Sequence, residues 1–487
     1  MKTRARLQTV RSVGAGVLLL AASVLRGEAP VVYTLSCSPS EPGAVRVELA
    51  VPVGSMPATL VIPRAIPMGY GEAPYDRYVS EVRASSAGGT PLEVERRDGP
   101  RWRIRGTEPV RRLSYRVDLS RMEKEIRAAS DSSKARPGYA GVLGYSVFGF
   151  VEGFEGRAIE LVVRAPEDWP VFSTLAPEAP PQHGSVRASA TDFYQLADSQ
   201  IAMGPKIEVR RLEARVPLFF VSYTEASSDL DLTAKLSREA LDAVADYFGS
   251  TPFPHYTVYE EILQPIDAEH DYGFSMEHLD SCTVFMAAEN GLSAESTNGY
   301  AGRARYGFAH HIAHAWIPKR SYGEGYFPFS WELAPVLDTI WFSEGFAQYA
   351  AIVALAQGRS DAAAYRSDLL QRRFQSVLDE APDVIRRMST VELSRVASTR
   401  YASDFRTGAN SFARGGLMAA EMDDLIAAKT GGRKSLRDAL RGLVAWSGRE
   451  RRGFRVEELP GLLAQDTGVD VRAVFDRWLA PPAGSAR

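Results

Sequence analysis

Residues 310–320 read His310-His311-Ile312-Ala313-His314-Ala315-Trp316-Ile317-Pro318-Lys319-Arg320. The chain has only seven histidines, and three of them lie within residues 310–314. Residues 306–317 contain a single glycine and no proline, so we expect a helix there. On a helix, His310 and His314 project from the same face. Two imidazoles at that spacing can share one Zn²⁺, each about 2.0–2.1 Å from the metal.

A third ligand must come from another part of the chain, and Glu344 is the best candidate. It lies in the segment WFSEGF, residues 341–346, after 29 residues that follow His314. An unpaired carboxylate among such apolar neighbours would be costly, and a cation explains its placement. The alternative is a histidine cluster on the surface or in the core. For an isolated His-x-x-x-His that alternative is favoured, because the spacing often arises by chance.

Working outward from this stretch, the period of the hydrophobic residues changes along the chain. Residues 45–51, 101–105 and 113–119 alternate between apolar and polar positions, which predicts strands of an antiparallel sandwich. Residues 236–248 instead place their apolar residues on one helical face and end at Gly249. Beyond residue 300 most segments are predicted to be helical. The charged, serine-rich stretch 123–137 is expected to be a solvated loop or a short surface helix.

These patterns predict an α+β multidomain protein. We expect a signal peptide over residues 1–29 and an N-terminal β-sandwich over 31–207. An α/β zinc-binding domain is expected over 208–350 and a helical domain over 351–482. Two or three domains also suit a chain of 487 residues.

Composition excludes several classes of function. Lys plus Arg number 57 against 60 Asp plus Glu, so there is no basic excess and no nucleic-acid partner is expected. Two cysteines exclude a disulfide scaffold and a cysteine-rich zinc finger. Cys37 and Cys282 remain free to form one bridge or none.

The first residues resemble a secretory signal. A basic segment with Lys2, Arg4, Arg6 and Arg11 precedes the apolar residues 13–25. That run is shorter than the roughly 20 residues that a membrane span needs. We expect a secreted or periplasmic protein without a span in the mature chain; an uncleaved signal that anchors the protein is the alternative.

The motifs together resemble the glycyl aminopeptidase family of gluzincins (metallopeptidase family sixty-one). Residues 310–320 are similar to that family's zinc helix, H-E-x-x-H followed by Trp and Lys-Arg. Residues 341–349 are similar to its third-ligand segment, residues 276–278 to its G-G-L-E-H motif, and residues 475–478 to its closing helix. The likeness runs from about residue 31 to 482. The aminopeptidase N family shares the architecture but has a shorter interval to its third ligand.

The resemblance implies a thermolysin-like middle domain with zinc on His310, His314 and Glu344. It also implies that Glu277 and His278 bind substrate, with Glu277 pairing with the free α-ammonium of a peptide or protein. A PDZ module, which many relatives carry, is not expected here. The resemblance gives no oligomeric state.

The sequence departs from the family where the chemistry takes place. The glutamate of H-E-x-x-H, which takes a proton from the attacking water and returns it to the leaving amine, is replaced by His311. Phe412 stands where relatives have a tyrosine whose phenol donates to the oxyanion. Phe274-Ser275 replaces a double glycine. Glu324 and Glu332 remain alternative bases.

We therefore expect a metallopeptidase-like protein in which His311 is the altered catalytic base and peptide hydrolysis is reduced or lost. A general acid–base group contributes roughly 10²–10⁴ to the rate. The alternatives are a pseudo-peptidase that binds peptides or proteins, and a metal-dependent hydrolase of a non-peptide bond.

Overall fold

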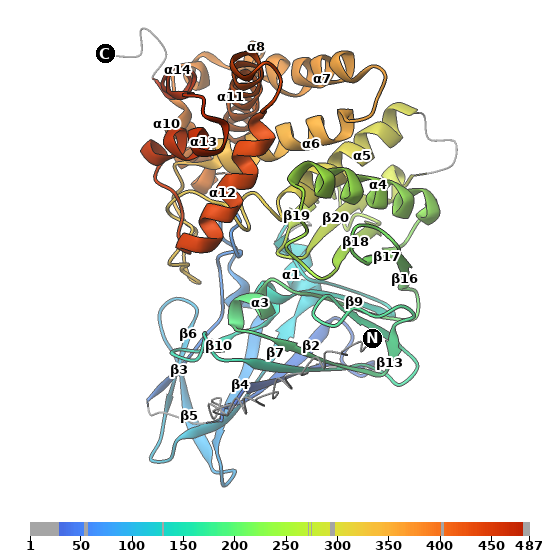
Figure 1. Ribbon diagram of the computed structural model, residues 1–487. Coiled ribbons are helices and arrows are strands. Elements are labelled where there is room, and N and C mark those ends of the chain that lie inside the picture. Colours follow the sequence, from blue (N-terminus) through green and yellow to red (C-terminus); the bar gives the residue numbers. More distant parts are fainter. Residues whose placement is uncertain are drawn as a thin grey trace, which may run out of the picture.

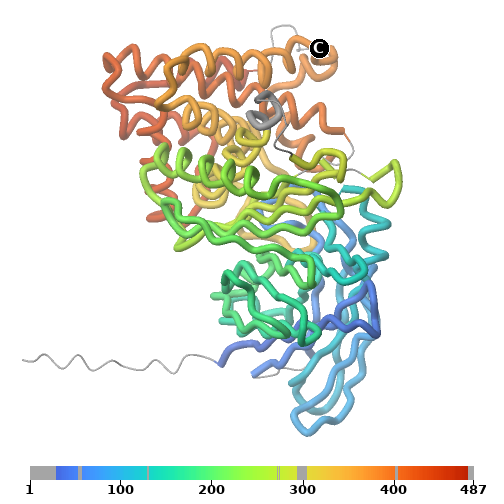
Figure 2. Tube along the Cα trace, turned by 90° about the vertical axis from the view of Figure 1, so that its right-hand side faces the viewer, coloured from blue at the N-terminus to red at the C-terminus, as the bar shows by residue number. Residues whose placement is uncertain are grey.

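The computed structural model describes residues 29–52, 57–128, 131–270, 272–273, 275–292, 298–400 and 404–480, with the backbone alone for 298–303. The expected signal segment up to residue 28 and Phe274 lie outside the described residues. Strands occupy one end of the molecule and helices the other, with a smaller sheet between them (Figures 1 and 2).

Two sheets form the N-terminal part. The larger has ten strands in the order β10-β3-β6-β5-β4-β7-β2-β1-β11-β14, and the smaller has five in the order β13-β12-β15-β9-β8. The larger sheet is made of β1 Val31–Cys37, β2 Ala44–Ala50, β3 Ala58–Val61, β4 Val79–Ser86, β5 Pro91–Arg96, β6 Arg101–Arg105, β7 Val110–Asp118, β10 Phe150–Val151, β11 Ile159–Arg164 and β14 Ser185–Ala190. The smaller sheet is made of β8 Lys134–Arg136, β9 Tyr139–Leu143, β12 Pro170–Ser173, β13 Gln182–His183 and β15 Gln200–Met203. Three short helices accompany them: α1 Leu119–Glu125, α2 Gly144–Val147 and α3 Phe193–Ala197.

The alternation seen in the sequence has the expected result. Val45, Val47 and Leu49 of β2 are buried in the core between the sheets, and the residues between them face outward. The expectation of an antiparallel arrangement is wrong at one pair, because β1 and β11 run parallel. These strands are far apart in the chain and no hairpin joins them, so their relative direction is not forced.

The third sheet contributes Glu277 to the candidate site. Its order is β16-β17-β18-β20-β19, with bounds Glu208–Leu212, Leu218–Thr224, Tyr256–Leu263, Ser281–Ala287 and Ser275–Glu277. The pairs β17–β18 and β18–β20 are parallel, and the two outer pairs are antiparallel. Helix α4, Leu230–Phe248, connects β17 to β18, and Gly249 ends it in the left-handed conformation at φ 73°, as predicted.

The helical half packs onto α4 and on α5, Asn298–Ala313 (Figure 1). It comprises α6 Ala347–Ala356, α7 Ala362–Leu370, α8 Ser376–Asp379, α9 Asp383–Arg386, α10 Thr390–Arg400, α11 Phe405–Thr430, α12 Leu436–Glu450, α13 Leu459–Thr467 and α14 Arg472–Leu479. Within the described part of the chain, no helix is both long and apolar enough to span a membrane.

The helix that carries the histidines ends earlier than expected. It stops at Ala313 rather than Ile317, and residues 314–320 form turns. Pro318 explains the difference, because it has no N–H to donate and disfavours helical geometry in the residue before it. His314 still donates its backbone N–H to the carbonyl of His310 at 3.3 Å, so it stays one helical turn above His310.

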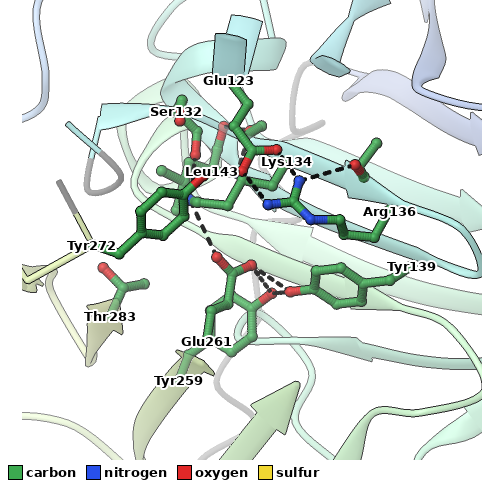
Figure 3. A network of polar contacts seen from close by, with 12 residues as sticks. Glu123, Ser132, Lys134, Arg136, Tyr139, Leu143, Tyr259, Glu261, Tyr272 and Thr283 are labelled. Carbon is green, nitrogen blue, oxygen red and sulfur yellow. Dashed lines mark hydrogen bonds and ion pairs between the residues drawn. The ribbon is translucent and has the colours of Figure 1, made fainter. Parts of the chain in front are cut away.

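The stretch 123–137 corrects the sequence-based expectation most strongly. Lys124, Glu125 and Arg127 are exposed as expected, but Glu123 and Lys134 are each only 1% exposed, so the described part of the segment is solvated only in part. Lys134 Nζ lies 3.1 Å from Glu261 Oε2 of β18, and Arg136 pairs with Glu123 (Figure 3). The charges are buried because partners across the junction between the N-terminal strands and the third sheet neutralise them.

The two cysteines do not pair. Cys37 is half-buried, Cys282 is buried in β20, and both thiols are free.

Candidate metal centre

His310, His314 and Glu344 lie close together. Glu344 Oε2 lies 3.1 Å from His310 Nε2 and 3.5 Å from His314 Nε2. The ring centroids of the two histidines are 4.5 Å apart. His314 is fully buried and the side chain of His310 is 12% exposed, so the three groups share a nearly dry site. Their separations are those of atoms that surround one small ion.

The hydrogen bonds of His314 fit a metal ligand. Its Nδ1 lies 2.8 Å from the carbonyl oxygen of Ile317, which only an N–H can satisfy. That contact keeps a proton on Nδ1, so Nε2, which faces Glu344, is the nitrogen available to a metal. Nε2 is buried and has no hydrogen-bond partner among the described residues. A metal ion at this nitrogen, in place of a proton, would give it a partner.

Glu277 brings a second carboxylate to the site. It is the last residue of β19 and is 5% exposed. One ligand atom each from Glu277, His314 and Glu344 lies within 4.8 Å of the others. Strand β19 ends the third sheet and pairs with β20 alone among the described strands. Glu277 therefore lies beside the candidate ligands and next to an open sheet edge.

His311 also faces the group. One ring nitrogen each from His310, His311 and His314 lies within 4.8 Å of the others. The His311 Nδ1 is buried and has no hydrogen-bond partner in the described part of the chain. The His311 ring therefore lies toward the other two histidines.

Tyr70, which the sequence analysis did not select, contacts the site from the N-terminal part. Its hydroxyl donates a hydrogen bond to Glu344 Oε1 at 3.1 Å. Tyr70 follows a tight turn in which Gly69 donates its N–H to the Ile66 carbonyl and Met68 has a φ of 51°. A tyrosine in a turn has no periodic signal.

Glu344 is held by a π-helical turn, Trp341–Phe346, packed against α11. The backbones touch at two glycines. A Cβ on Gly415 would lie 1.8 Å from the Trp341 carbonyl oxygen, and one on Gly345 would lie 2.5 Å from the Gly416 nitrogen. π-Helical turns are frequent at functional sites because they redirect side chains within a helix. Here the turn places Glu344 opposite the histidines.

His278 is engaged by the protein itself. It is 1% exposed, and its Nδ1 and Nε2 lie 3.0 Å from Asp198 Oδ1 and 3.4 Å from Thr283 Oγ1. Lys319 Nζ lies 3.7 Å from the same Asp198 oxygen. These contacts fix the backbone beside Glu277. Substrate binding by His278 itself stays a prediction.

The electrostatics of the cluster suit a cation. Burial disfavours charge on Glu344, yet the neighbouring histidines hold the pKa of its carboxyl well below the usual range. Burial also opposes protonation of His314, but Glu277 and Glu344 together raise the pKa of its imidazole to about 9. Burial and the two other rings lower the pKa of His311 well below 6.5, so it is neutral.

The other sequence-based alternatives lie away from the cluster. Glu332 forms an ion pair with Arg101, with 2.5 Å between Oε1 and Nη2, and Glu324 is exposed. Neither carboxylate belongs to a metal-binding group of the described residues. Phe412 packs in the small apolar cluster that contains Tyr326, beside Tyr70, and has no hydroxyl to donate.

With this geometry in view, two domain models of one peptidase family match the chain. The Peptidase M61 N-terminal domain matches residues 32–205, and M61 glycyl aminopeptidase matches residues 304–412. The chain belongs to this family. Members of the glycyl aminopeptidase family are metallopeptidases, so this chain is a peptidase-like protein. A comparison with curated proteins gave no match.

Solved structures show the same fold at low identity. An aminopeptidase N family protein from Idiomarina loihiensis superposes with a TM-score of 0.80 at 19% identity, covering 92% of this chain and 76% of that one. An M1 zinc metallopeptidase from Deinococcus radiodurans gives 0.52 at 17% identity, covering 93% and 94%. A mutant of the latter, bound to a Tyr-Ser-Ala substrate, gives 0.54 at 16% identity with the same coverage. This family member thus has the multidomain fold of the aminopeptidases.

Proposed function

We propose that this protein holds one Zn²⁺ on His310, His314 and Glu344, binds the free amino terminus of a peptide or protein at Glu277, and hydrolyses peptide bonds slowly or not at all. The observation that carries the proposal is the convergence of Glu344 on two imidazoles at 3.1 and 3.5 Å, with an imidazole where relatives have the basic carboxylate. Family membership supports zinc as the ion, and two nitrogens with one carboxylate oxygen are a usual zinc ligand set.

Glu277 is suited to bind an α-ammonium group. Its carboxylate is nearly buried, where a charge-assisted hydrogen bond to a cation is strong. The open edge of β19 allows an extended peptide to pair with the strand that ends at Glu277. An occupant bound in this way would place its first peptide bond beside the histidines.

The reason for weak hydrolysis is the proton transfer at His311. Zinc, when bound, supplies the positive charge that polarises a scissile carbonyl. A base must then accept the proton of the attacking water and deliver it to the leaving amine. The His311 imidazole is neutral and can accept that proton, but the resulting cation would stand beside a metal and two further imidazoles. Phe412 offers no hydroxyl for the oxyanion.

Location remains a proposal on sequence grounds. The basic and apolar residues before position 26 lead us to propose an exported protein, secreted or periplasmic.

Metal content and turnover of an aminoacyl-anilide test the proposal. Wild type should contain about one zinc per chain and turn over slowly or not at all. Glu344→Ala should lose the metal, and His311→Glu should gain roughly 10²–10⁴-fold in rate. Fast wild-type turnover that Glu344→Ala abolishes would instead identify a working aminopeptidase. Metal-dependent turnover of an ester but not an anilide would favour hydrolysis of a non-peptide bond.

Binding is tested separately with one peptide in two forms, with a free and with an acetylated amino terminus. We expect the free form to bind at least tenfold more tightly, and Glu277→Gln to remove that difference. Glu324→Gln is the matched control, because this carboxylate is exposed and away from the cluster. Equal affinity for the two forms would contradict the role of Glu277.

A further inference from the structure

We propose that His311 is itself a ligand, so that three imidazoles and Glu344 surround the ion with protein atoms. This inference rests on the proposed metal site. It adds that the coordination position which a peptidase leaves for its attacking water is taken by a side chain of this protein. The replacement at position 311 would then convert an open site into a closed one, rather than exchange one base for another.

The distances allow the three rings to share one ion. Their ligand nitrogens lie within 4.8 Å of one another, and the ring centroid of His311 is 4.7 Å from that of His310 and 5.8 Å from that of His314. Three nitrogens that are no more than 4.8 Å apart all lie within roughly 2.8 Å of a common point. A Zn–N bond is about 2.0–2.1 Å long. Shifts of under an ångström bring all three into bonding range.

The environment supplies no other partner for His311. Its Nδ1 is buried and has no hydrogen-bond partner among the described residues. Among the residues that the structure describes, the side-chain hydrogen bond that reaches His311 comes from the Tyr256 hydroxyl and goes to its backbone carbonyl, at 3.5 Å. A buried polar group without a partner costs free energy, and an ion relieves that cost.

Coordination number has a direct consequence for chemistry. Catalytic zinc sites use three protein ligands and keep one position open, whereas structural sites use four. With His310, His311, His314 and Glu344 all bound, the site has the ligand count of a structural centre. Its occupant would hold α5, the turn that follows it and the turn Trp341–Phe346 together, and a peptide at Glu277 would be held but not cleaved.

Cobalt substitution tests the coordination without measuring activity. Wild-type protein is stripped of metal, reloaded with one equivalent of Co²⁺, and its visible absorption recorded; Zn²⁺ affinity is measured by competition with a chromophoric chelator. We expect His311→Ala and His311→Gln to change the Co²⁺ spectrum and to weaken Zn²⁺ binding at least tenfold. Imidazole added to His311→Ala should restore the wild-type spectrum. His183→Ala is the control, because His183 is exposed on β13, and it should match wild type.

The outcomes separate the two proposals. If both His311 variants keep the spectrum and bind Zn²⁺ within twofold of wild type, His311 is not a ligand, and the proposed site on His310, His314 and Glu344 stands. If Glu344→Ala binds metal as wild type does, both proposals fall. Circular dichroism of each variant shows whether it is folded, and His311→Gln is the second variant should the alanine substitution disturb the helix.

Discussion

Tyr70 connects the strand-rich half of the molecule to the metal-binding residues through one hydrogen bond to Glu344 Oε1, across 274 positions of sequence. Groups that hydrogen-bond to a metal ligand orient it, and their loss usually weakens metal binding 10–100-fold. We expect Tyr70→Phe to weaken Zn²⁺ binding by about that factor and to leave the melting temperature of the metal-free protein nearly unchanged.

The control for this prediction is Tyr33→Phe. Tyr33 is more deeply buried than Tyr70, at 2% exposure, and its hydroxyl donates to the Gly149 carbonyl at 2.9 Å instead of to a candidate metal ligand. Removal of that phenol should lower stability, not metal affinity. Chelator competition on the two variants checks this, and equal Zn²⁺ affinity in Tyr70→Phe and wild type would refute the positioning role.

Glu260 makes stability depend on pH. It is fully buried in β18, its oxygens have no hydrogen-bond partner within the described ranges, and burial raises the pKa of its carboxyl from 4.5 to about 8. Between these two values the unfolded chain releases a proton that the folded protein keeps, so the free energy of unfolding falls as pH rises through this window.

Glu260→Gln should therefore flatten this part of the profile and stabilise the protein at pH 8 more than at pH 5. Urea transitions at both pH values measure the effect. The exposed Glu324→Gln serves as reference, and a profile identical to wild type in Glu260→Gln would disprove the assignment.

The π-helical turn Trp341–Phe346 has no space for an added side-chain atom at Gly345. Because a Cβ on Gly345 would overlap the backbone of α11, Gly345→Ala must displace the turn and Glu344 with it. Overpacking of this kind costs typically 1–3 kcal/mol. We expect that loss of stability together with weaker metal binding.

Gly448→Ala is the matched substitution. Gly448 is exposed in α12 and nothing lies within 4 Å of its added Cβ, so helix propensity should stabilise the protein by roughly 0.5–1 kcal/mol. Thermal melts and metal content of both variants are the measurements. An unchanged metal content in Gly345→Ala would show that the turn tolerates displacement.

The sequence predicted individual helices and strands where one hydrophobic period, or one glycine that ends a helix, determines the local structure. The alternation of β2 and the glycine at the end of α4 predicted those elements, and the four-residue spacing brought His310 and His314 together. The π-helical turn could not be predicted, because its geometry depends on the contact of Gly345 with α11, 70 residues further on. The burial of Glu123 and Lys134 was missed because it depends also on Tyr272 and Glu261, which local composition does not indicate.

For the whole molecule, the junction between the N-terminal strands and the third sheet is electrostatic as well as apolar. Lys134 and Glu261 are 1% and 2% exposed in their side chains, and Tyr139 and Tyr259 also bind Glu261 (Figure 3). Removal of one member of a buried ion pair leaves an uncompensated charge and costs about 3–5 kcal/mol.

We therefore expect Lys134→Met to lower the free energy of unfolding by about 3–5 kcal/mol, and the double variant with Glu261→Leu to recover much of it. Arg121→Met breaks the exposed pair with Glu125 and should cost under about 1 kcal/mol. Urea denaturation of these variants checks the prediction. A single variant as stable as wild type would show that water relieves the buried carboxylate.

Family membership could be recognised from sequence because several short motifs occur in one order over most of the chain. Tyr70 could not be assigned to the site, since its contact with Glu344 exists only once the two halves have docked.

Because Tyr70 contacts Glu344, we expect zinc retention to depend on how the N-terminal strands pack against the part of the chain that carries the histidines. A low concentration of denaturant that breaks only the contact between Tyr70 and Glu344 should release zinc while the far-ultraviolet circular dichroism stays that of the folded protein. In a chimeric protein, residues 31–207 would come from a relative and the rest from this chain. We expect it to bind zinc weakly unless the relative has a tyrosine at the position of Tyr70.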